Sequence, residues 1–227
     1  MAEPVGDGDG DGAGAGAGDN VLGVDSGGSG LRIAVARIAP DGGRSRPAAT
    51  FTSHEPVRTG PAGIDADHML EQLLPAATEL ARQVGAAGFA AGCVGAAGMG
   101  TLGDALRARL PGALSDAFGV RRLALAADAV TAYAGTLGQR PGVVVPDAVV
   151  ALTGGLLALG APLRDPLRAA LAARLPDARP AEALGSPLDG ALAIAAALAE
   201  DRLALPVDGK LLQITGHVAD SPPRRAG

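Results

Sequence analysis

The sequence predicts an α/β protein in which helices cover a mixed β-sheet. Three strand-like segments come first in the chain, and helix-like and strand-like segments then alternate from residue 64 to residue 138. Consecutive strands followed by such an alternation are typical of a mixed sheet with helices on its faces. Of the 227 residues, 48% are hydrophobic, which is enough for the core that this architecture requires.

The first three strands are predicted from short runs rich in β-branched residues. Two of them, "VLGVDS" at residues 21–26 and "LRIAVARI" at residues 31–38, are joined by "GGSG". This tetrapeptide predicts a hairpin turn, with glycines where a positive φ is needed. The segment "PAATFTSHEP", residues 47–56, can supply a third antiparallel strand.

A helix is predicted next, over residues 64–85, where apolar side chains recur at helical spacing. Asp65 is expected to be its N-cap, and Pro75 is expected to kink or split it.

Two further pairs of elements follow this helix. "FAAGCVGAAGMG", residues 89–100, predicts a buried strand that ends in a glycine-rich loop, and residues 101–119 predict an interrupted helix. Residues 121–128 predict a strand, and residues 129–138 predict a helix that begins beside Asp128.

The C-terminal part of the chain predicts one strand, two helices and a last short strand. The strand covers residues 148–153 and precedes a Gly-Gly turn, a proline-rich loop separates the two helices, and "KLLQIT" at residues 210–215 is the last strand. The acidic Gly/Ala-rich start and the C-terminal end are expected to be disordered. The expected organisation is a tail at 1–20, an N-terminal lobe at 21–140, a C-terminal lobe at 141–215 and a tail at 216–227.

Composition argues against several kinds of partner and site. The net charge is −5 and no basic stripe is present, which argues against nucleic acid and anionic membranes as main partners. Cys93 is the single cysteine, so no intrachain disulfide can form; a reducing cytoplasm is the expected compartment, and Cys93 is most simply a small apolar core residue. The three histidines, His54, His68 and His217, lack ligand spacing, and we expect surface residues and no zinc site. Neither a signal peptide nor a membrane span is predicted.

Five stretches, in this order, resemble known motifs: "GVDSGGSGLRIAV", "GCVGAAGMG", "LALAADAVTAYAG", "VVALTGGLLALG" and "GSPLDGALAIA". Together they resemble the actin/hexokinase/chaperone ATPase superfamily and, more narrowly, the N-acetylglucosamine kinase-like, BadF/BadG/BcrA/BcrD-type ATPase family. The resemblance implies a ribonuclease H-like lobe with a mixed sheet, as in actin-like ATPases, plus a second lobe that is truncated in this chain.

The resemblance also implies cofactors, partners and site residues. ATP and Mg²⁺ are the implied cofactors, and transfer of the γ-phosphoryl group to an amino-sugar hydroxyl is the implied reaction. Asp25 would orient the metal, and Asp128 would act as general base. The remaining implied residues contact the phosphates (Ser26, Gly27, Gly28, Ser29 and Gly30), the nucleotide (Gly154 and Gly155) and the sugar (Gly95 and Gly98, with Gly100 a weaker candidate).

Each motif taken alone has a simpler structural interpretation. A strand-ending Asp before Gly-Gly is most often a hairpin turn, Asp128 alone is more often a helix N-cap than a base, and Gly-Gly marks turns in general. The order of the motifs favours the family. A P-loop is excluded because the single lysine, Lys210, lies near the C-terminus, and a Rossmann fingerprint is excluded because "GGSG" precedes a strand-like run.

The family's second phosphate motif, Gly-Thr-Gly-Ser, is absent between Asp128 and Gly154. A kinase that lacks one phosphate corner is expected to lose orders of magnitude in activity. The apolar residues Val143 to Val145, Val149, Val150 and Leu152 are expected to lack part of their packing partners. The alternatives are therefore a catalytically inactive nucleotide- or sugar-binding remnant with a regulatory role, or a chain that barely folds; a homodimer also stays open.

Overall fold

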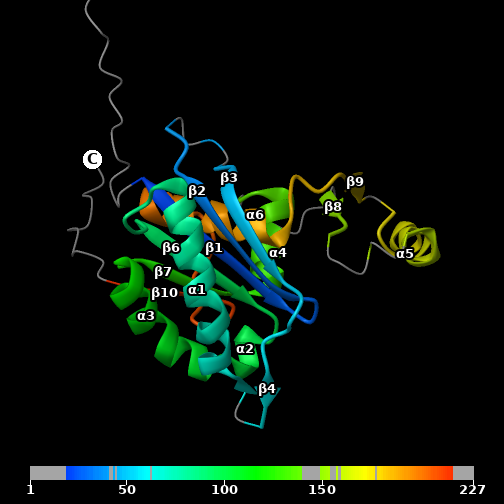
Figure 1. The fold of residues 1–227 in the computed structure, drawn as a ribbon. Helices are drawn as coiled ribbons and strands as arrows, with labels where there is room; N and C mark the ends of the chain where they lie inside the picture. Colours follow the sequence, from blue (N-terminus) through cyan, green and yellow to red (C-terminus); the bar gives the residue numbers. More distant parts are fainter. Residues whose placement is uncertain are drawn as a thin grey trace, which may run out of the picture.

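The computed structural model describes residues 19–40, 43, 45–61, 63–139, 149–153, 157, 160–176 and 178–216 (Figure 1). Its helices and strands, in chain order, are β1 (Asn20–Gly27), β2 (Gly30–Arg37), β3 (Pro47–Ser53), β4 (Thr59–Gly60), β5 (Gly63–Ile64), α1 (Ala66–Val84), β6 (Ala91–Ala96), α2 (Met99–Leu102), α3 (Asp104–Phe118), β7 (Leu123–Ala127), α4 (Asp128–Leu137), β8 (Val149–Ala151), α5 (Ala161–Arg174), β9 (Arg179–Ala181), α6 (Pro187–Ala199) and β10 (Leu212–Thr215). None of the helices in these ranges is both long enough and apolar enough to cross a membrane.

A six-stranded sheet in the order β10-β7-β6-β1-β2-β3 forms the centre of the protein. The chain enters it as an antiparallel meander, β1-β2-β3, and then adds β6 and β7 parallel to β1 on the other side. The predicted mixed α/β sheet of a ribonuclease H-like lobe is confirmed by this arrangement, including the third antiparallel strand.

Helices cover both faces of this sheet. Helices α1 and α3 pack on one face, against the large aliphatic side chains that alternate along the strands, such as Leu22, Ile33 and Leu125. Phe89 and Phe118, with ring centroids 5.3 Å apart, close one end of this layer. Helices α4 and α6 cover the opposite face (Figure 1).

The face under α4 and α6 is built from small residues, which lets these helices lie close to the strands. Alanines and Cys93 predominate there, and Cys93 is fully buried, which raises the pKa of its thiol. A Cβ on Gly23 would stand 2.9 Å from Leu192 Cγ of α6, and a Cβ on Gly95 would stand 2.7 Å from Thr131 Cγ2 of α4. The many alanines and glycines of the sequence therefore set the spacing of this layer.

Helices α4 and α6 also touch each other backbone to backbone. A Cβ on Gly190 would overlap the carbonyl oxygen of Thr131, and a Cβ on Gly135 would overlap the carbonyl oxygen of Ser186. Where α6 begins, the Leu184 N–H donates to the Thr136 carbonyl oxygen at 3.0 Å. Only glycine permits this crossing distance.

The range 141–215, predicted as a C-terminal lobe, contributes elements to two sheets. Helix α6 packs on the six-stranded sheet and β10 pairs with β7, although both lie in the range 141–215. Strands β8 and β9 form a separate two-stranded sheet beside α5, to one side of the main body (Figure 1). Of the predicted tails, 1–20 and 216–227, residues 1–18 and 217–227 lie outside the described residues, as do Val143 to Val145. The N-terminal tail is shorter than predicted, because Asn20 is buried and begins β1.

Most of the expected local features of the helices are present. The Asp65 side chain accepts from the His68 N–H at 3.0 Å and caps α1, as predicted. Pro75 does not split α1, which runs from Ala66 to Val84 with Pro75 on its exposed side. The interruption expected within residues 101–119 occurs at Gly103, between α2 and α3.

His68 corrects the prediction of surface histidines. His54 is exposed, whereas His68 is only 5% exposed. His68 Nδ1 accepts from the Arg58 N–H at 3.0 Å, and His68 Nε2 lies 3.2 Å from Glu55 Oε1, so both ring nitrogens have partners. His68 lies in the first turn of α1, and its ring contacts Glu55 and Arg58 in the segment that follows β3. His217 lies outside the described residues.

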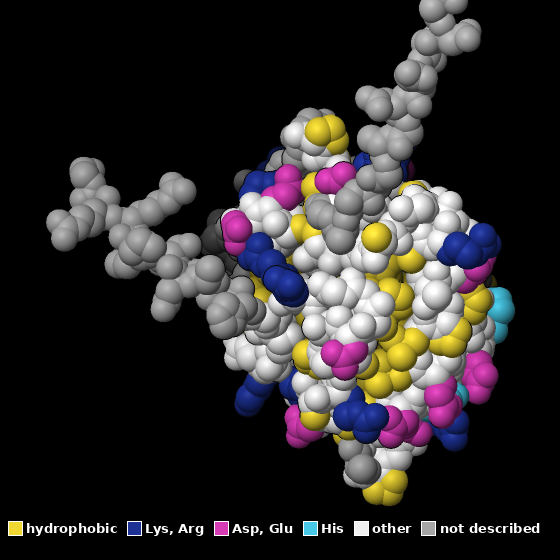
Figure 2. Space-filling view, turned by 60° about the vertical axis from the view of Figure 1, so that its left-hand side comes forward, with side chains coloured by type: hydrophobic (Ala, Val, Ile, Leu, Met, Phe, Trp, Pro, Cys, Tyr) yellow, Lys and Arg dark blue, Asp and Glu magenta, His cyan; other side chains and the backbone are white. Residues whose placement is uncertain are grey.

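The surface carries charges of both signs. Figure 2 shows Lys and Arg side chains interspersed with Asp and Glu, around a band of apolar side chains. On this face no area is occupied by basic side chains alone.

Candidate functional site at the carboxyl edge of the sheet

The carboxyl ends of three parallel strands, β1, β6 and β7, meet at one edge of the sheet. Asp25 of β1 is in register with Gly95 of β6, and Gly95 is in register with Ala126 of β7. Asp128 follows the last residue of β7. Strand β6 lies between β1, which carries Asp25, and β7, which leads to Asp128. Strands β1 and β7 are therefore about 10 Å apart. The topology thus brings together two carboxylates that are 103 positions apart in the chain.

Asp25 lies on the α4/α6 face of β1, beneath the start of α4. The residue is 9% exposed. Burial raises the pKa of the Asp25 carboxyl above its ordinary value of 3.8, the Arg32 guanidinium acts against this shift, and the charge of Asp128 adds to it. The two carboxylates therefore lie close enough to interact electrostatically.

Arg32 is the partner of Asp25, and sequence reasoning missed it. The Arg32 guanidinium donates from Nη1 to Asp25 Oδ2 at 3.3 Å and from Nη2 to Ser29 Oγ at 3.2 Å. Arg32 stands directly opposite Asp25 in the β1–β2 register. The signal was available, because a two-residue turn between Gly27 and Gly30 fixes this pairing.

The tip of the β1–β2 hairpin carries no side chains at Gly27 and Gly28. A Cβ on Gly27 or on Gly28 would meet no atom within 4 Å, so the backbone there is open to a ligand. Within "GGSG" only Gly30 has a φ in the left-handed region, at 119°, which corrects the broader expectation of positive φ at this turn. A Cβ on Gly30 would overlap the Ser53 carbonyl oxygen, so in this structure Gly30 permits β2 and β3 to approach each other.

The two serines of the corner differ in exposure. Ser26 is buried, and its carbonyl oxygen accepts from the Ala97 N–H at 2.9 Å, which ties β1 to the loop after β6. Ser29 is exposed and its hydroxyl accepts from Arg32. Ser29 is therefore the hydroxyl that a ligand can reach.

Asp128 is the first residue of α4, and its carboxylate is exposed. Asp128 Oδ1 accepts from the Ala129 N–H at 2.9 Å, while the N-cap position belongs to Ala127. The N-terminal end of a helix favours a negative charge, so this position suits a carboxylate.

Gly95 and Gly98, expected on the sugar side, have local structural roles. Gly95 makes room for Thr131 of α4, and Gly98 adopts a φ of 84° at the start of α2. Gly98 lies in the loop at the carboxyl end of β6, on the same edge as Asp25 and Asp128. Gly154 and Gly155 lie outside the described residues.

A loop that the sequence did not single out borders Asp128. The Ala127 N–H donates to the Leu211 carbonyl oxygen at 2.7 Å, and Arg107 donates to the carbonyl oxygens of Met99 and Lys210 at 2.6 and 3.1 Å. The Asp208 carboxylate accepts the backbone N–H groups of residues 210, 211 and 212. These bonds lower the pKa of Asp208 and fix the loop beside the edge.

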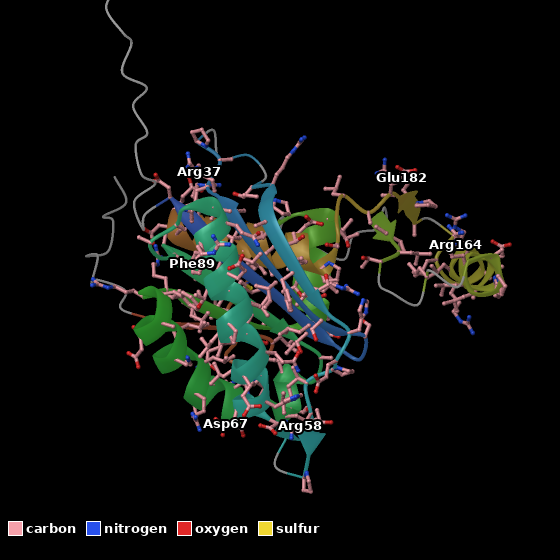
Figure 3. All side chains as sticks on the ribbon, in the orientation of Figure 1. Arg37, Arg58, Asp67, Phe89, Arg164 and Glu182 are labelled. Carbon is pink, nitrogen blue, oxygen red and sulfur yellow. The ribbon has the colours of Figure 1, made fainter. Side chains whose placement is uncertain are left out.

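Two cavities lie elsewhere in the described residues. One, of about 470 Å³, is lined by residues at the start of α1, including Arg58 and Asp67 (Figure 3). The other, of about 740 Å³, is formed by α5 and the β8–β9 sheet and is lined by Val150, Leu152 and Arg164 among others. Val150 and Leu152 are among the residues expected to lack partners, and they are half-buried. Neither cavity is lined by Asp25 or Asp128.

The donor set at the edge offers a divalent metal few protein ligands, so waters or phosphate oxygens must complete its coordination. In the part of the chain that the structure describes, no group of three or more His, Cys, Asp and Glu side chains could hold a metal ion. Mg²⁺ is commonly held by one or two carboxylates, waters and substrate phosphates. Asp25 can supply one carboxylate once Arg32 releases it.

Comparisons with known proteins give weak structural similarities. No protein-family model matches the chain, and no curated protein matches it. Among solved structures, the ROK hexokinase from Thermus thermophilus is 21% identical with a TM-score of 0.39, and the match covers 59% of this chain and 43% of the hexokinase. RuvC from Thermus thermophilus is 17% identical with a TM-score of 0.37, and the match covers 80% of this chain and 96% of RuvC. A candidate N-acetylglucosamine kinase from Chromobacterium violaceum is 25% identical with a TM-score of 0.32, and the match covers 60% of this chain and 42% of that kinase. The matched region spans about two fifths of each kinase, and TM-scores this low establish no relationship.

Proposed function

We propose that the edge formed by Asp25, the Gly27–Gly28 tip and Asp128 binds the polyphosphate of ATP with Mg²⁺ and transfers a phosphoryl group to a sugar hydroxyl. The observation that carries this proposal is the juxtaposition of two carboxylates, one in β1 and one directly after β7, beside a hairpin tip without side chains at Gly27 and Gly28. An amino sugar as acceptor follows from the sequence resemblance.

The chemistry needs few groups, because phosphoryl transfer depends on positioning and charge neutralisation. When bound, Mg²⁺ would neutralise phosphate charge. The backbone N–H groups at the hairpin tip can donate to phosphate oxygens without steric hindrance from side chains. Asp25 lies two residues before Gly27 on β1, and its buried carboxylate needs a cationic partner to stay charged.

Asp128 is the candidate general base. Its exposed carboxylate at the start of α4 can accept the proton of an acceptor hydroxyl that reaches hydrogen-bond distance. Thr131 supports its position, because the Thr131 hydroxyl donates to the Asp128 carbonyl oxygen at 3.0 Å.

The test measures ADP formation from Mg-ATP with and without N-acetylglucosamine. We expect sugar-dependent turnover that D128N reduces by about 100-fold or more, in line with the loss of a general base. Asp116, an exposed residue of α3, is the matched control, and D116N should leave the rate unchanged. Sugar-dependent turnover that survives D128N would contradict the role of Asp128.

The second candidate is a polyphosphate-binding module without catalysis. The Asp25–Arg32 ion pair favours it, because the carboxylate already has a cation. Binding of Mg-ATP in calorimetry without ADP formation would support this function over the kinase.

A further inference from the structure

We propose that Arg32 is an internal cation that holds Asp25 in the free protein and moves to the phosphates when a metal-polyphosphate binds. This inference rests on the proposed function and adds the residue that couples the metal side of the site to the phosphate side.

The geometry places one guanidinium between the two sides. Nη1 contacts Asp25 within the sheet, and Nη2 contacts Ser29 at the tip of the same hairpin. The planar fork of arginine is suited to two acceptors at once, and phosphate offers the same pair of acceptors. The Arg32 side chain is 36% exposed, so it can change partners without rearranging the core.

The electrostatics give a reason for the exchange. Asp25 is largely buried, and a buried carboxylate is costly unless a cation compensates it. Arg32 supplies this cation while no metal is present. A divalent ion that approaches Asp25 is repelled by the guanidinium, so the metal and Arg32 compete for one carboxylate.

The released guanidinium has a second acceptor nearby. The backbone beyond Gly27 and Gly28 is open, and Nη2 already points toward this tip through its bond to Ser29. A phosphate at the tip would therefore take the place of Asp25 as the anionic partner of Arg32. The exchange keeps every charge paired in both states.

This model predicts effects of opposite sign on two ligands. Removal of Arg32 weakens binding of the polyphosphate, because a cation is lost from the phosphate side. The same removal tightens binding of a divalent metal alone, because the competitor for Asp25 is lost. If Arg32 only stabilised the fold, its removal would weaken the binding of both ligands or of neither.

The experiment uses calorimetry on the full chain with sodium tripolyphosphate in the absence of metal, and separately with Mn²⁺ alone. For R32Q we expect at least tenfold weaker tripolyphosphate binding and several-fold tighter Mn²⁺ binding, and R32K should recover part of the tripolyphosphate affinity. Arg37 lies at the opposite end of β2 and is exposed (Figure 3), so R37Q is the matched control and should alter neither affinity.

The outcomes separate this inference from the proposed function. Wild-type protein that binds neither ligand overturns the role of Arg32, whereas wild-type protein that does not bind Mg-ATP overturns the proposed function, and the role of Arg32 with it. Wild-type protein that binds both, with R32Q unchanged or weakened for both ligands, overturns the role of Arg32 alone. Far-ultraviolet circular dichroism of R32Q establishes that the sheet is retained.

Discussion

Gly190 of α6 lies directly against the Thr131 carbonyl oxygen of α4, so that a Cβ at residue 190 would overlap it. This contact brings the two helices of one face together over the strands that carry Asp25 and Gly95. The crossing therefore sets the position of Asp128 at the start of α4.

We expect G190A to destabilise the protein by about 3 kcal/mol, because overpacking against backbone cannot be relieved by a rotamer change. Urea denaturation measures the difference. The matched control is G112A, since Gly112 lies within α3 and a Cβ there would meet nothing within 4 Å. G112A should stabilise the protein by about 0.5 to 1 kcal/mol through helix propensity. Equal effects of the two substitutions would contradict the crossing.

The pH dependence of stability reports on Asp25. Burial raises its pKa above 3.8 in the folded state, so its favourable contribution is full below pH 3.8 and is lost as the pH rises through the folded-state value. We expect D25N to gain stability relative to wild type over that rise, because asparagine does not titrate and so carries no cost of ionisation in a buried site. Urea midpoints between pH 4 and 7 provide the measurement. A D25N difference that does not change with pH would show that the carboxyl titrates normally.

The buried imidazole of His68 is predicted to support the segment around Arg58. H68A leaves the Arg58 N–H without its acceptor and removes a buried ring, and we expect a loss of about 2 to 3 kcal/mol. H68N should recover part of this loss, because the asparagine oxygen can replace Nδ1 as acceptor. H54A, at an exposed site, is expected to stay within about 0.5 kcal/mol of wild type. Thermal or chemical denaturation of the three variants distinguishes these cases.

The Asp208 carboxylate is predicted to fix the loop beside Asp128. Its pKa is lowered by three backbone N–H donors, so its contribution to stability is present above pH 3.8 and is lost as the pH falls through the folded-state value. D208A should lower the melting temperature at neutral pH but lose this effect in strong acid, and hydrogen exchange of residues 210–212 should accelerate. Unchanged exchange at these amides would contradict the role of Asp208.

Local patterns predicted the strands of the six-stranded sheet, its mixed character and the placement of Asp25 and Asp128 at strand ends, because alternation and turn residues act over short distances; the short strands β4, β5 and β9 were not predicted. To predict Arg32 as the partner of Asp25, the length of the turn must first be converted into the register between β1 and β2. The burial of His68 and the docking of α6 on the first sheet depend on contacts between segments far apart in the chain. Gly95 and Gly190 show the same limit, since a glycine that permits close packing has the same sequence signal as one that binds a ligand.

The bond between Thr136 and Leu184 means that the chain leaves the main body and returns to it at nearly the same point. The free-energy cost of closing a loop grows only slowly with its length, by about 0.6 kcal/mol per doubling. Shortening or lengthening the segment between these two residues is therefore expected to change the stability of the main sheet little. Insertions and deletions in this segment can be tolerated while the carboxyl edge of the sheet keeps its structure.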